Sequence, residues 1–275
     1  MKILFFGDCM FGRDNNPFIE NPFVNIEKAI KNVDLIIFNL ETNISAIPLD
    51  ESFRDDKVFN YQSNGIQLIT LRQLTDKPII ASIANNHSLD YGLEGYKATK
   101  EFLGTNNILF ADKREYLELD NIIYISASDH CGCKDIKIWG QYIWIIDYSN
   151  LKPIIDKLAI LKKKKKKIVF SLHWGSNWVD EIPPEMSSLG KLLIDNGVSI
   201  VFGHSAHHIP PIPVEKYKGG FIIYGLGDFI NDYAVTAKYK SDHSLMCGVD
   251  LKKKLYSLYP VKRSFINKNS IPFLL

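Results

Sequence analysis

Histidines, acids and amides gather directly after apolar runs of this sequence. Among the histidines, His87, His173, His204, His207 and His208 stand within six residues of the end of such a run. Each residue taken alone has a structural explanation, such as a turn cap or a satisfied core histidine. Metal binding, in contrast, accounts for the whole set. Its members are Asp8, Asn39, Glu41, Asn85, Asn86, His87, Asp90, His173, His204, His207 and His208.

The types of these residues indicate which metals they would bind and what reaction would follow. Carboxylate, amide oxygen and imidazole without a thiolate cluster suit Mn, Fe, Zn, Ni or Co better than calcium or a structural zinc. The set is larger than one ion takes from the protein at an open catalytic site, which predicts two divalent ions. Two ions about 3.5 to 4 Å apart activate a bridging water and hold the attacking and leaving oxygens of an in-line displacement. The predicted reaction is phosphoester hydrolysis.

The apolar runs have the length of buried strands, and amphipathic segments of helical period alternate with several of them. This alternation predicts an α/β protein in which two sheets pack together with helices outside. After about Phe221 an antiparallel tail is expected to complete a second sheet. Carboxyl ends of parallel strands meet at one rim, where ligands bind. The predicted strands are Ile3–Phe6, Leu35–Phe38, Ile79–Ala84, Ile122–Ser126, Ile143–Ile146, Ile168–Leu172, Ser199–Phe202 and Phe221–Tyr224; the predicted helices are Val24–Val33, Gly65–Leu74, Leu93–Leu103, Leu151–Leu161 and Met186–Ile194.

Composition limits the class of protein and its partners. The 275 residues are expected to form a single domain, 1–275, and the formal net charge of +2 gives no sign of a nucleic-acid binder. Four scattered cysteines predict reduced thiols in a cytoplasmic protein. No apolar run approaches the roughly 20 residues of a membrane span, so no membrane anchor is expected. The lysines at 162–167 suggest binding to nucleic acid or to a membrane surface, or a hydrated turn after a helix, and the hydrated turn is favoured.

Several motifs together resemble a known family. They are GDCMFGR, NLE, ANNHSLDYG, HWGSNW and GHSAHHIPPIPVEKYKGGFIIYGLGDFINDY, in that order. The set is similar to bacterial capsule-synthesis proteins of the CapA, or poly-γ-glutamate synthesis, type, which look like a branch of the calcineurin-like metallophosphoesterases. The resemblance runs from Met1 to about Asp250. It implies a four-layer α/β/β/α sandwich of two mixed sheets, and a metal-dependent phosphoesterase linked to capsule or poly-γ-glutamate metabolism.

The resemblance also implies a role for each matching residue. Asp8 and His207 would bind the first metal, with Glu41 as the bridging carboxylate. The ligands of the second metal would be Asn86, His173 and His204. His87 would be the general acid, with Asp90 orienting its ring, and Arg13 would clamp phosphate or carboxylate.

The sequence departs from the family pattern at four places. Met10 stands where the broader superfamily has a histidine, and Asp228 stands where an asparagine is usual, so Asp228 could supply the missing ligand. The spacing Gly-His-x-x-His leaves His207 or His208 as the ligand, with His207 preferred. Asn177 replaces a glutamate that many members carry. Together with Trp174 it is a candidate for the pocket wall, and Asn39 is a further candidate ligand.

Two other functions compete with hydrolysis of a small or polymeric phosphoester. One is an accessory protein that binds a polyanionic polymer such as poly-γ-glutamate without hydrolysing it. The other is a degenerate fold that serves as a scaffold. The near-complete ligand set favours the hydrolase.

Overall fold

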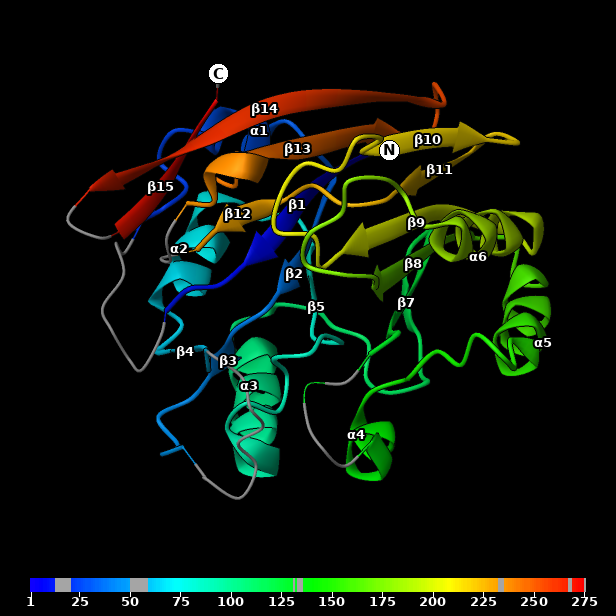
Figure 1. Cartoon of the computed structure of the whole chain (residues 1–275), viewed down its shortest axis with the longest axis horizontal. Coiled ribbons are helices and arrows are strands. Elements are labelled where there is room, and N and C mark those ends of the chain that lie inside the picture. The colour runs from blue at the N-terminus through cyan, green and yellow to red at the C-terminus, as the bar shows by residue number, and fades with distance from the viewer. Residues whose placement is uncertain are drawn as a thin grey trace.

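Two β-sheets packed face to face form the centre of the molecule (Figure 1). The computed structural model describes residues 1–12, 21–49, 59–130, 132, 136–231, 235–266 and 269–274. The first sheet has the strand order β15-β14-β13-β1-β2-β5, with β12 also paired to β1. Its strands are β1 (Lys2–Cys9), β2 (Leu35–Leu40), β5 (Ile79–Ser82), β12 (Asp228–Ile230), β13 (His243–Asp250), β14 (Leu255–Ile266) and β15 (Asn269–Leu274).

The second sheet has the order β10-β11-β9-β8-β7-β6. Its strands are β6 (Leu117–Leu119), β7 (Ile122–Ser128), β8 (Lys167–His173), β9 (Val198–His204), β10 (Val214–Tyr217) and β11 (Gly220–Ile223). Strands β7, β8, β9 and β11 pair in parallel, whereas the edge strands β6 and β10 are antiparallel to their neighbours. In the first sheet β12, β1, β2 and β5 are parallel and β13 to β15 are antiparallel. Both sheets are therefore mixed.

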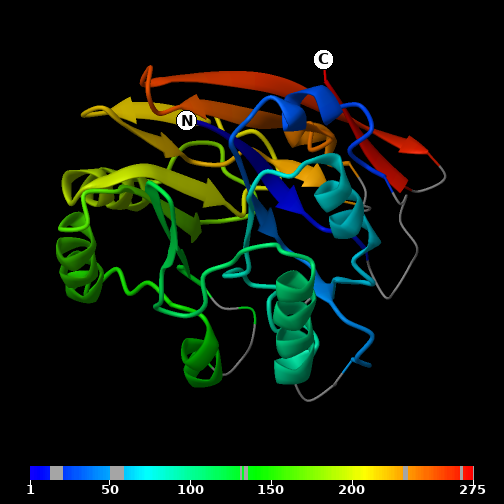
Figure 2. The ribbon, with the colours of Figure 1, turned by 180° about the vertical axis from the view of Figure 1, so that it is seen from behind.

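Helices cover the outer faces of both sheets. Figures 1 and 2 show α1 to α3 on one side of the molecule and α5 and α6 on the other. The helices are α1 (Glu27–Lys31), α2 (Ile66–Leu74), α3 (Gly92–Thr105), α4 (Ile136–Tyr142), α5 (Lys152–Lys162) and α6 (Pro184–Asp195). A short 3-10 helix, η1 (Ala237–Tyr239), and a small pair of strands, β3 (Asn43–Ile44) and β4 (Gln62–Ser63), complete the elements.

Three buried clusters hold these layers together. One lies between the sheets, where Phe5 of β1 contacts Phe202 of β9 with ring centroids 5.0 Å apart. A second packs α1, α2 and α3 against the first sheet, and a third packs α5 and α6 against the second sheet. Central strands are buried on both faces, which is why they appear in the sequence as continuous apolar runs. The expected α/β/β/α sandwich of two mixed sheets is confirmed.

One expectation about the elements was wrong, and another was right only in part. Ile143–Ile146 is not a strand of either sheet: it makes a single bridge, Ser128 to Ile145, and is buried as an extended segment after α4. A short apolar run does not by itself predict a strand, because a segment can be buried without forming backbone hydrogen bonds to a neighbouring strand. The tail after Phe221 is antiparallel only in part: β13 to β15 are antiparallel and complete the sheet of β1, whereas β11 runs parallel to β9 and β12 runs parallel to β1.

The lysine-rich segment connects α5 to β8, as the hydrated-turn interpretation expected. Lys164 and Lys166 each form an ion pair with Glu118 at 2.8 Å. Across the described ranges, every helix falls short of the length and apolarity that a transmembrane span requires.

Candidate metal centre

Strand register brings the predicted residues to one rim of the sandwich. In the first sheet Asp8 pairs with Asn39 of β2 on one side and with Asp228 of β12 on the other. In the second sheet His173 at the end of β8 pairs with His204 at the end of β9. The backbone N–H of Ser205 donates to Asp8 Oδ2 at 3.1 Å. This bond joins the two sheets, so both contribute side chains to the same place.

Asp8, His207 and Asp228 form a buried cluster. One ligand atom from each lies within 4.8 Å of those of the other two. His207 Nδ1 is 2.7 Å from Asp228 Oδ1. Two carboxylates and one imidazole that converge in this way are a donor set suited to a divalent cation. Asp228 stands beside Asp8 in place of the histidine that the sequence lacks at Met10.

The carboxylates of this cluster are buried, and Arg263 Nη2 lies 4.0 Å from Asp228 Oδ2. Burial, together with the charge of Asp228, raises the pKa of Asp8 to about 7, even though His207 and hydrogen bonds from Asn39 and Ser205 oppose the shift. Burial alone would lower the pKa of His207, but the carboxylates of Asp228 and Asp8 raise it. A cation would stabilise the ionised carboxylates, so the electrostatics of the cluster fit a metal ion.

Asn39 links this cluster to Glu41. Its Nδ2 donates to Asp8 Oδ1 and to Glu41 Oε2, both at 2.9 Å. Its own side-chain oxygen accepts a hydrogen bond from Asn85 at 3.0 Å. The amide of Asn39 thus orients two carboxylates, and its role as a metal or substrate ligand stays a prediction.

His173 and His204 form a second group of donors. Their Nδ1 atoms are 2.9 Å apart, and His204 Nε2 lies 3.0 Å from Ser171 Oγ. His173 Nε2 is buried without a hydrogen-bond partner among the described residues. Burial lowers the pKa of His173 well below its usual value and that of His204 to about 3, and the nearby His130 adds to both shifts. The neutral imidazole favoured by these shifts is the form that binds metals.

His87 and Asp90 stand beside Glu41. His87 Nδ1 is 2.7 Å from Asp90 Oδ2, which also accepts the backbone N–H of Tyr61 at 2.9 Å. The other ring nitrogen, Nε2, lies 3.9 Å from Glu41 Oε1. Asp90 thus fixes the ring so that Nε2 faces the carboxylates. Asn86 lies in the same turn after β5 and is partly exposed.

Comparison with known proteins identifies the family. The model of the family described as bacterial capsule synthesis protein PGA_cap matches residues 2–131 and 127–233. The chain belongs to this family. It is 31% identical over 233 residues to a probable polyglutamine synthesis accessory protein of Mycobacterium tuberculosis, a match that covers 77% of this chain and 59% of the relative.

Two proteins named CapA are also similar to this PGA_cap chain. The capsule biosynthesis protein CapA of Bacillus anthracis is 26% identical over 254 residues, which cover 84% of this chain and 59% of the relative. The PGA biosynthesis protein CapA of Bacillus subtilis is 24% identical over 269 residues, which cover 90% and 67%. The chain spans about three fifths of the length of the first two relatives.

His207 and His208 occupy different environments in this PGA_cap chain. The backbone N–H of Val179 donates to His208 Nε2 at 3.0 Å, so Nδ1 must be the protonated nitrogen that donates to the carbonyl of Ile209, also at 3.0 Å. Both ring nitrogens of His208 are therefore in use. His207 is the histidine that faces Asp228, at 2.7 Å, which favours His207 over His208 as the candidate ligand.

Three other candidate residues lie outside the donor set. Trp174 is 1% exposed and packs in the core between the second sheet and its helices. Its Nε1 donates to the carbonyl of Tyr224 at 2.9 Å. The prediction that Trp174 forms a wall of the pocket is therefore corrected. The side chain of Asn177 is exposed, and its carbonyl accepts the N–H of His207 at 2.9 Å. Asn177 thus helps to position His207 through its backbone. Arg13 lies outside the described residues.

The sequence analysis missed Asp129 and His130, which follow β7. Asp129 Oδ1 is 2.5 Å from His130 Nδ1, while Oδ2 accepts the N–H of Gly175 at 2.9 Å and the hydroxyl of Tyr148 at 3.0 Å. The ring of His130 lies 4.9 Å from that of His173. The rule that found the other residues, polar groups directly after an apolar run, would also have selected this pair.

Proposed function

We propose that this PGA_cap protein is a metal-dependent phosphoesterase with two divalent ions. The observation that carries the proposal is the convergence of Asp8, His207 and Asp228 within 4.8 Å, next to the paired imidazoles of the second sheet. Structural ion pairs seldom combine two buried carboxylates with neutral histidines from another sheet. The same arrangement is well suited to metal ions.

The donors divide into two groups around Glu41. Asp8, His207 and Asp228 would hold the first ion, and Glu41, oriented by Asn39, would bridge. The residues that would hold the second ion are Asn86, His173 and His204. The mixture of oxygen and imidazole donors favours Mn, Fe, Zn, Ni or Co. Bound there, two such ions would supply an activated water and charge stabilisation for phosphoryl transfer.

The other residues of the site would position groups and move a proton. Asp90 holds His87 through Nδ1 at 2.7 Å, so that Nε2 faces Glu41 and the substrate side. In its protonated form, His87 would deliver a proton from Nε2 to the leaving oxygen, as a general acid does. Asn39 keeps Asp8 and Glu41 in a fixed orientation. Burial of both carboxylates excludes water from the base of the site.

Hydrolysis of nitrophenyl phosphates tests this proposal. Chelated protein reloaded with Mn²⁺ or Ni²⁺ is expected to release nitrophenolate from a phosphomonoester or a phosphodiester. Asp8→Ala is expected to lose both metal and activity, whereas His87→Ala is expected to keep the metal and lose activity by about 10²-fold or more. Absence of turnover on a broad phosphoester panel, with two ions per chain found by elemental analysis, would contradict the proposal.

A second candidate is a binding protein for a polyanionic polymer that it does not hydrolyse. The Mycobacterium tuberculosis relative is named a probable polyglutamine synthesis accessory protein, and this name favours the second candidate. Calorimetric titration of metal-loaded protein with poly-γ-glutamate oligomers separates the two: binding without cleavage of the polymer or of any phosphoester supports the accessory role. We propose that the protein carries out either function in the cytosol. The buried free thiols of Cys9 and Cys247 support this location, because thiols stay reduced there.

A further inference from the structure

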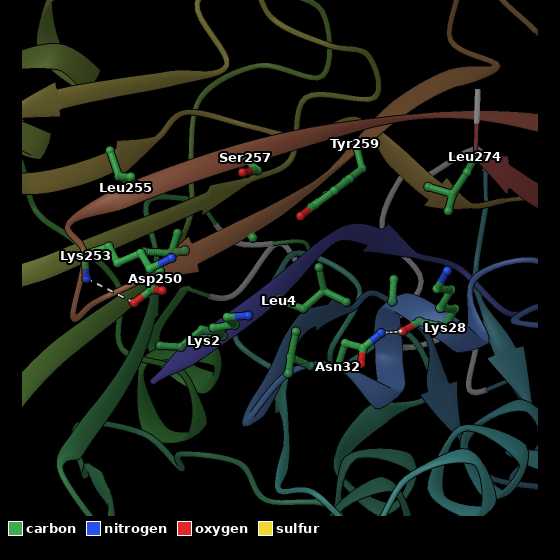
Figure 3. Close-up of a pocket in the computed structure, with 15 residues that line it drawn as sticks. Lys2, Leu4, Lys28, Asn32, Asp250, Lys253, Leu255, Ser257, Tyr259 and Leu274 are labelled. Atoms are coloured by element: carbon green, nitrogen blue, oxygen red, sulfur yellow. Dashed lines mark hydrogen bonds between the residues drawn. The ribbon is translucent and has the colours of Figure 1, made fainter.

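A second cavity lies at the opposite end of β1 from the candidate metal centre. It has a volume of about 480 Å³ and opens between α1, β1, β13 and β14 (Figure 3). Lys2, Ile3 and Leu4 line it, whereas Asp8 stands four residues after Leu4, roughly 13 Å along an extended strand. The volume is in the range of small-molecule sites in proteins, about 300 to 1,000 Å³. This cavity is therefore separate from the metal centre.

The floor and one wall of the cavity are apolar. The Leu4 side chain and the backbone of Ile3, Gly248 and Val249 form the floor, because the side chains of Ile3 and Val249 point into the core between the sheets. Leu255 and Tyr259 lie on the same face of β14, because side chains two and four residues apart point the same way. These two side chains are 59% and 42% exposed, since no described helix covers this part of the sheet. Covering them with an apolar group would remove a large hydrophobic surface from water.

Lysines surround this apolar space. Lys2, Lys28 and Lys253 line the cavity, and Asp250 is the one acid among the described lining residues. The Asp250 carboxylate accepts the backbone N–H groups of Lys252 at 3.0 Å and of Lys253 at 3.1 Å, so it is committed to a turn. Three ammonium groups against one carboxylate give the rim a positive charge that an anionic group would complement.

We propose that this cavity binds a single-chain amphiphile with an anionic head, of the class of long-chain carboxylates. The chain would lie over Leu4 and Gly248 against Leu255 and Tyr259, and the carboxylate would lie beside Lys28, which Figure 3 shows at the opposite end of the cavity from Lys2 and Lys253. Apolar walls disfavour a fully hydrophilic anion, and the lysine rim disfavours a cationic or neutral amphiphile. The inference does not depend on the proposed phosphoesterase activity.

Fluorescence titration of the full chain with 11-(dansylamino)undecanoate, below its micelle concentration, tests the proposal. Saturable binding of one probe per chain is expected. Lys28→Glu is expected to weaken binding at least tenfold, and Ser257→Trp, at an exposed position of the wall, is expected to block it by filling the space. Lys163→Glu makes the same charge change in the exposed turn after α5 and is expected to leave binding unchanged. Circular dichroism melts check that each variant is folded.

Four results, and a fifth with an amide analogue of the probe, would overturn the proposal. The first is no saturable binding, and the second is full binding to the folded Ser257→Trp variant. The third is an equal loss in Lys28→Glu and Lys163→Glu, which would indicate nonspecific attraction. The fourth is binding to phosphatidylglycerol vesicles without binding to the free probe. A matched probe with a primary amide in place of the carboxylate is expected to bind at least tenfold more weakly, and equal affinity would refute recognition of the anion.

Discussion

At the scale of single residues, His130 is the side chain whose role the structure adds to the metal centre. Asp129 accepts from its Nδ1, so Nε2 carries the lone pair, in the arrangement common to metal-binding histidines. We expect His130→Ala to weaken Mn²⁺ or Co²⁺ binding about tenfold or more and to change the visible spectrum of bound Co²⁺. Calorimetry and absorption spectroscopy measure the two effects.

His243 offers a matched control for this prediction. It also follows an aspartate, its Nδ1 lies 2.9 Å from Asp242 Oδ1, and its side chain is 32% exposed against 33% for His130. His243→Ala is expected to leave the affinity and the Co²⁺ spectrum unchanged. Equal losses in the two variants would mean that an exposed histidine binds metal nonspecifically.

The buried histidines also predict how stability depends on pH in the metal-free protein. The pKa of His204 falls from 6.5 to about 3 on folding. Between these two pH values the unfolded chain therefore binds a proton at His204 and the folded chain does not. The free energy of unfolding should therefore decrease as pH falls from about 6.5 towards 3, by at most about 5 kcal/mol from His204. Asp8 has the opposite effect on the pH dependence of stability, because folding raises its pKa from 3.8 to about 7. Its protonated form stabilises the folded state at low pH, and this contribution to the free energy of unfolding is lost as pH rises through 7.

Urea unfolding of chelated protein between pH 4 and 7 separates these contributions. His204→Asn is expected to show a smaller loss of stability at acid pH than the wild-type chain, whatever its stability at pH 7. Parallel pH profiles for the two proteins would show that His204 does not resist protonation in the fold.

At the scale of elements, the close contact between β1 and β12 holds Asp8 and Asp228 together. A Cβ atom at Gly7 would overlap the carbonyl oxygen of Gly227, so a side chain there would force the strands apart. We expect Gly7→Ala to destabilise the protein by about 2 to 3 kcal/mol and to weaken metal binding. Urea unfolding and calorimetry measure both quantities.

Gly104 in α3 provides the comparison for Gly7. A Cβ atom there meets nothing within 4 Å, and alanine is preferred to glycine inside a helix by about 0.5 to 1 kcal/mol. Gly104→Ala is expected to be neutral or stabilising and to bind metal normally. If Gly7→Ala behaved in the same way, the contact between the strands would not determine the geometry of the site.

Local pattern predicted most elements but not how the strands pair. Continuous apolar runs indicated β1, β2, β7, β8 and β9 because both faces of these strands are buried. The same criterion failed for Ile143–Ile146, which is buried without joining a sheet. The placement of β13 to β15 depends on pairing with β1, more than 230 residues earlier in the chain, and no local period carries that information.

For the site, the sequence indicated which residues meet at the rim but not what each one contacts. Residues after parallel strands were expected to converge, and Asp8, His173 and His204 do so. The orienting role of Asn39 depends on hydrogen bonds to two carboxylates from different turns. Trp174, next to His173, points into the core because successive side chains of a strand point to opposite faces. Such orientations follow from the register of the sheets.

At the scale of the whole molecule, the proposed metal ions would tie the two sheets together. Asp8, Glu41 and Asp228 come from the first sheet and its turns, whereas His173 and His204 come from the second. Separation of the sheets on unfolding would break both groups of ligands. A ligand that binds the folded state alone, at a concentration 100 times its Kd, stabilises that state by about 2.7 kcal/mol.

Saturating Mn²⁺ is therefore expected to raise the Tm of chelated protein by roughly 5 to 10 °C, and chelation should reverse the shift. Asp8→Ala, which removes a ligand from the first sheet, should abolish most of the shift, and His173→Ala, which removes one from the second, should do the same. Scanning calorimetry with Ca²⁺ as the control ion checks selectivity. An equal shift with Ca²⁺, or an undiminished shift in either variant, would show that the stabilising ion binds elsewhere and does not bridge the sheets.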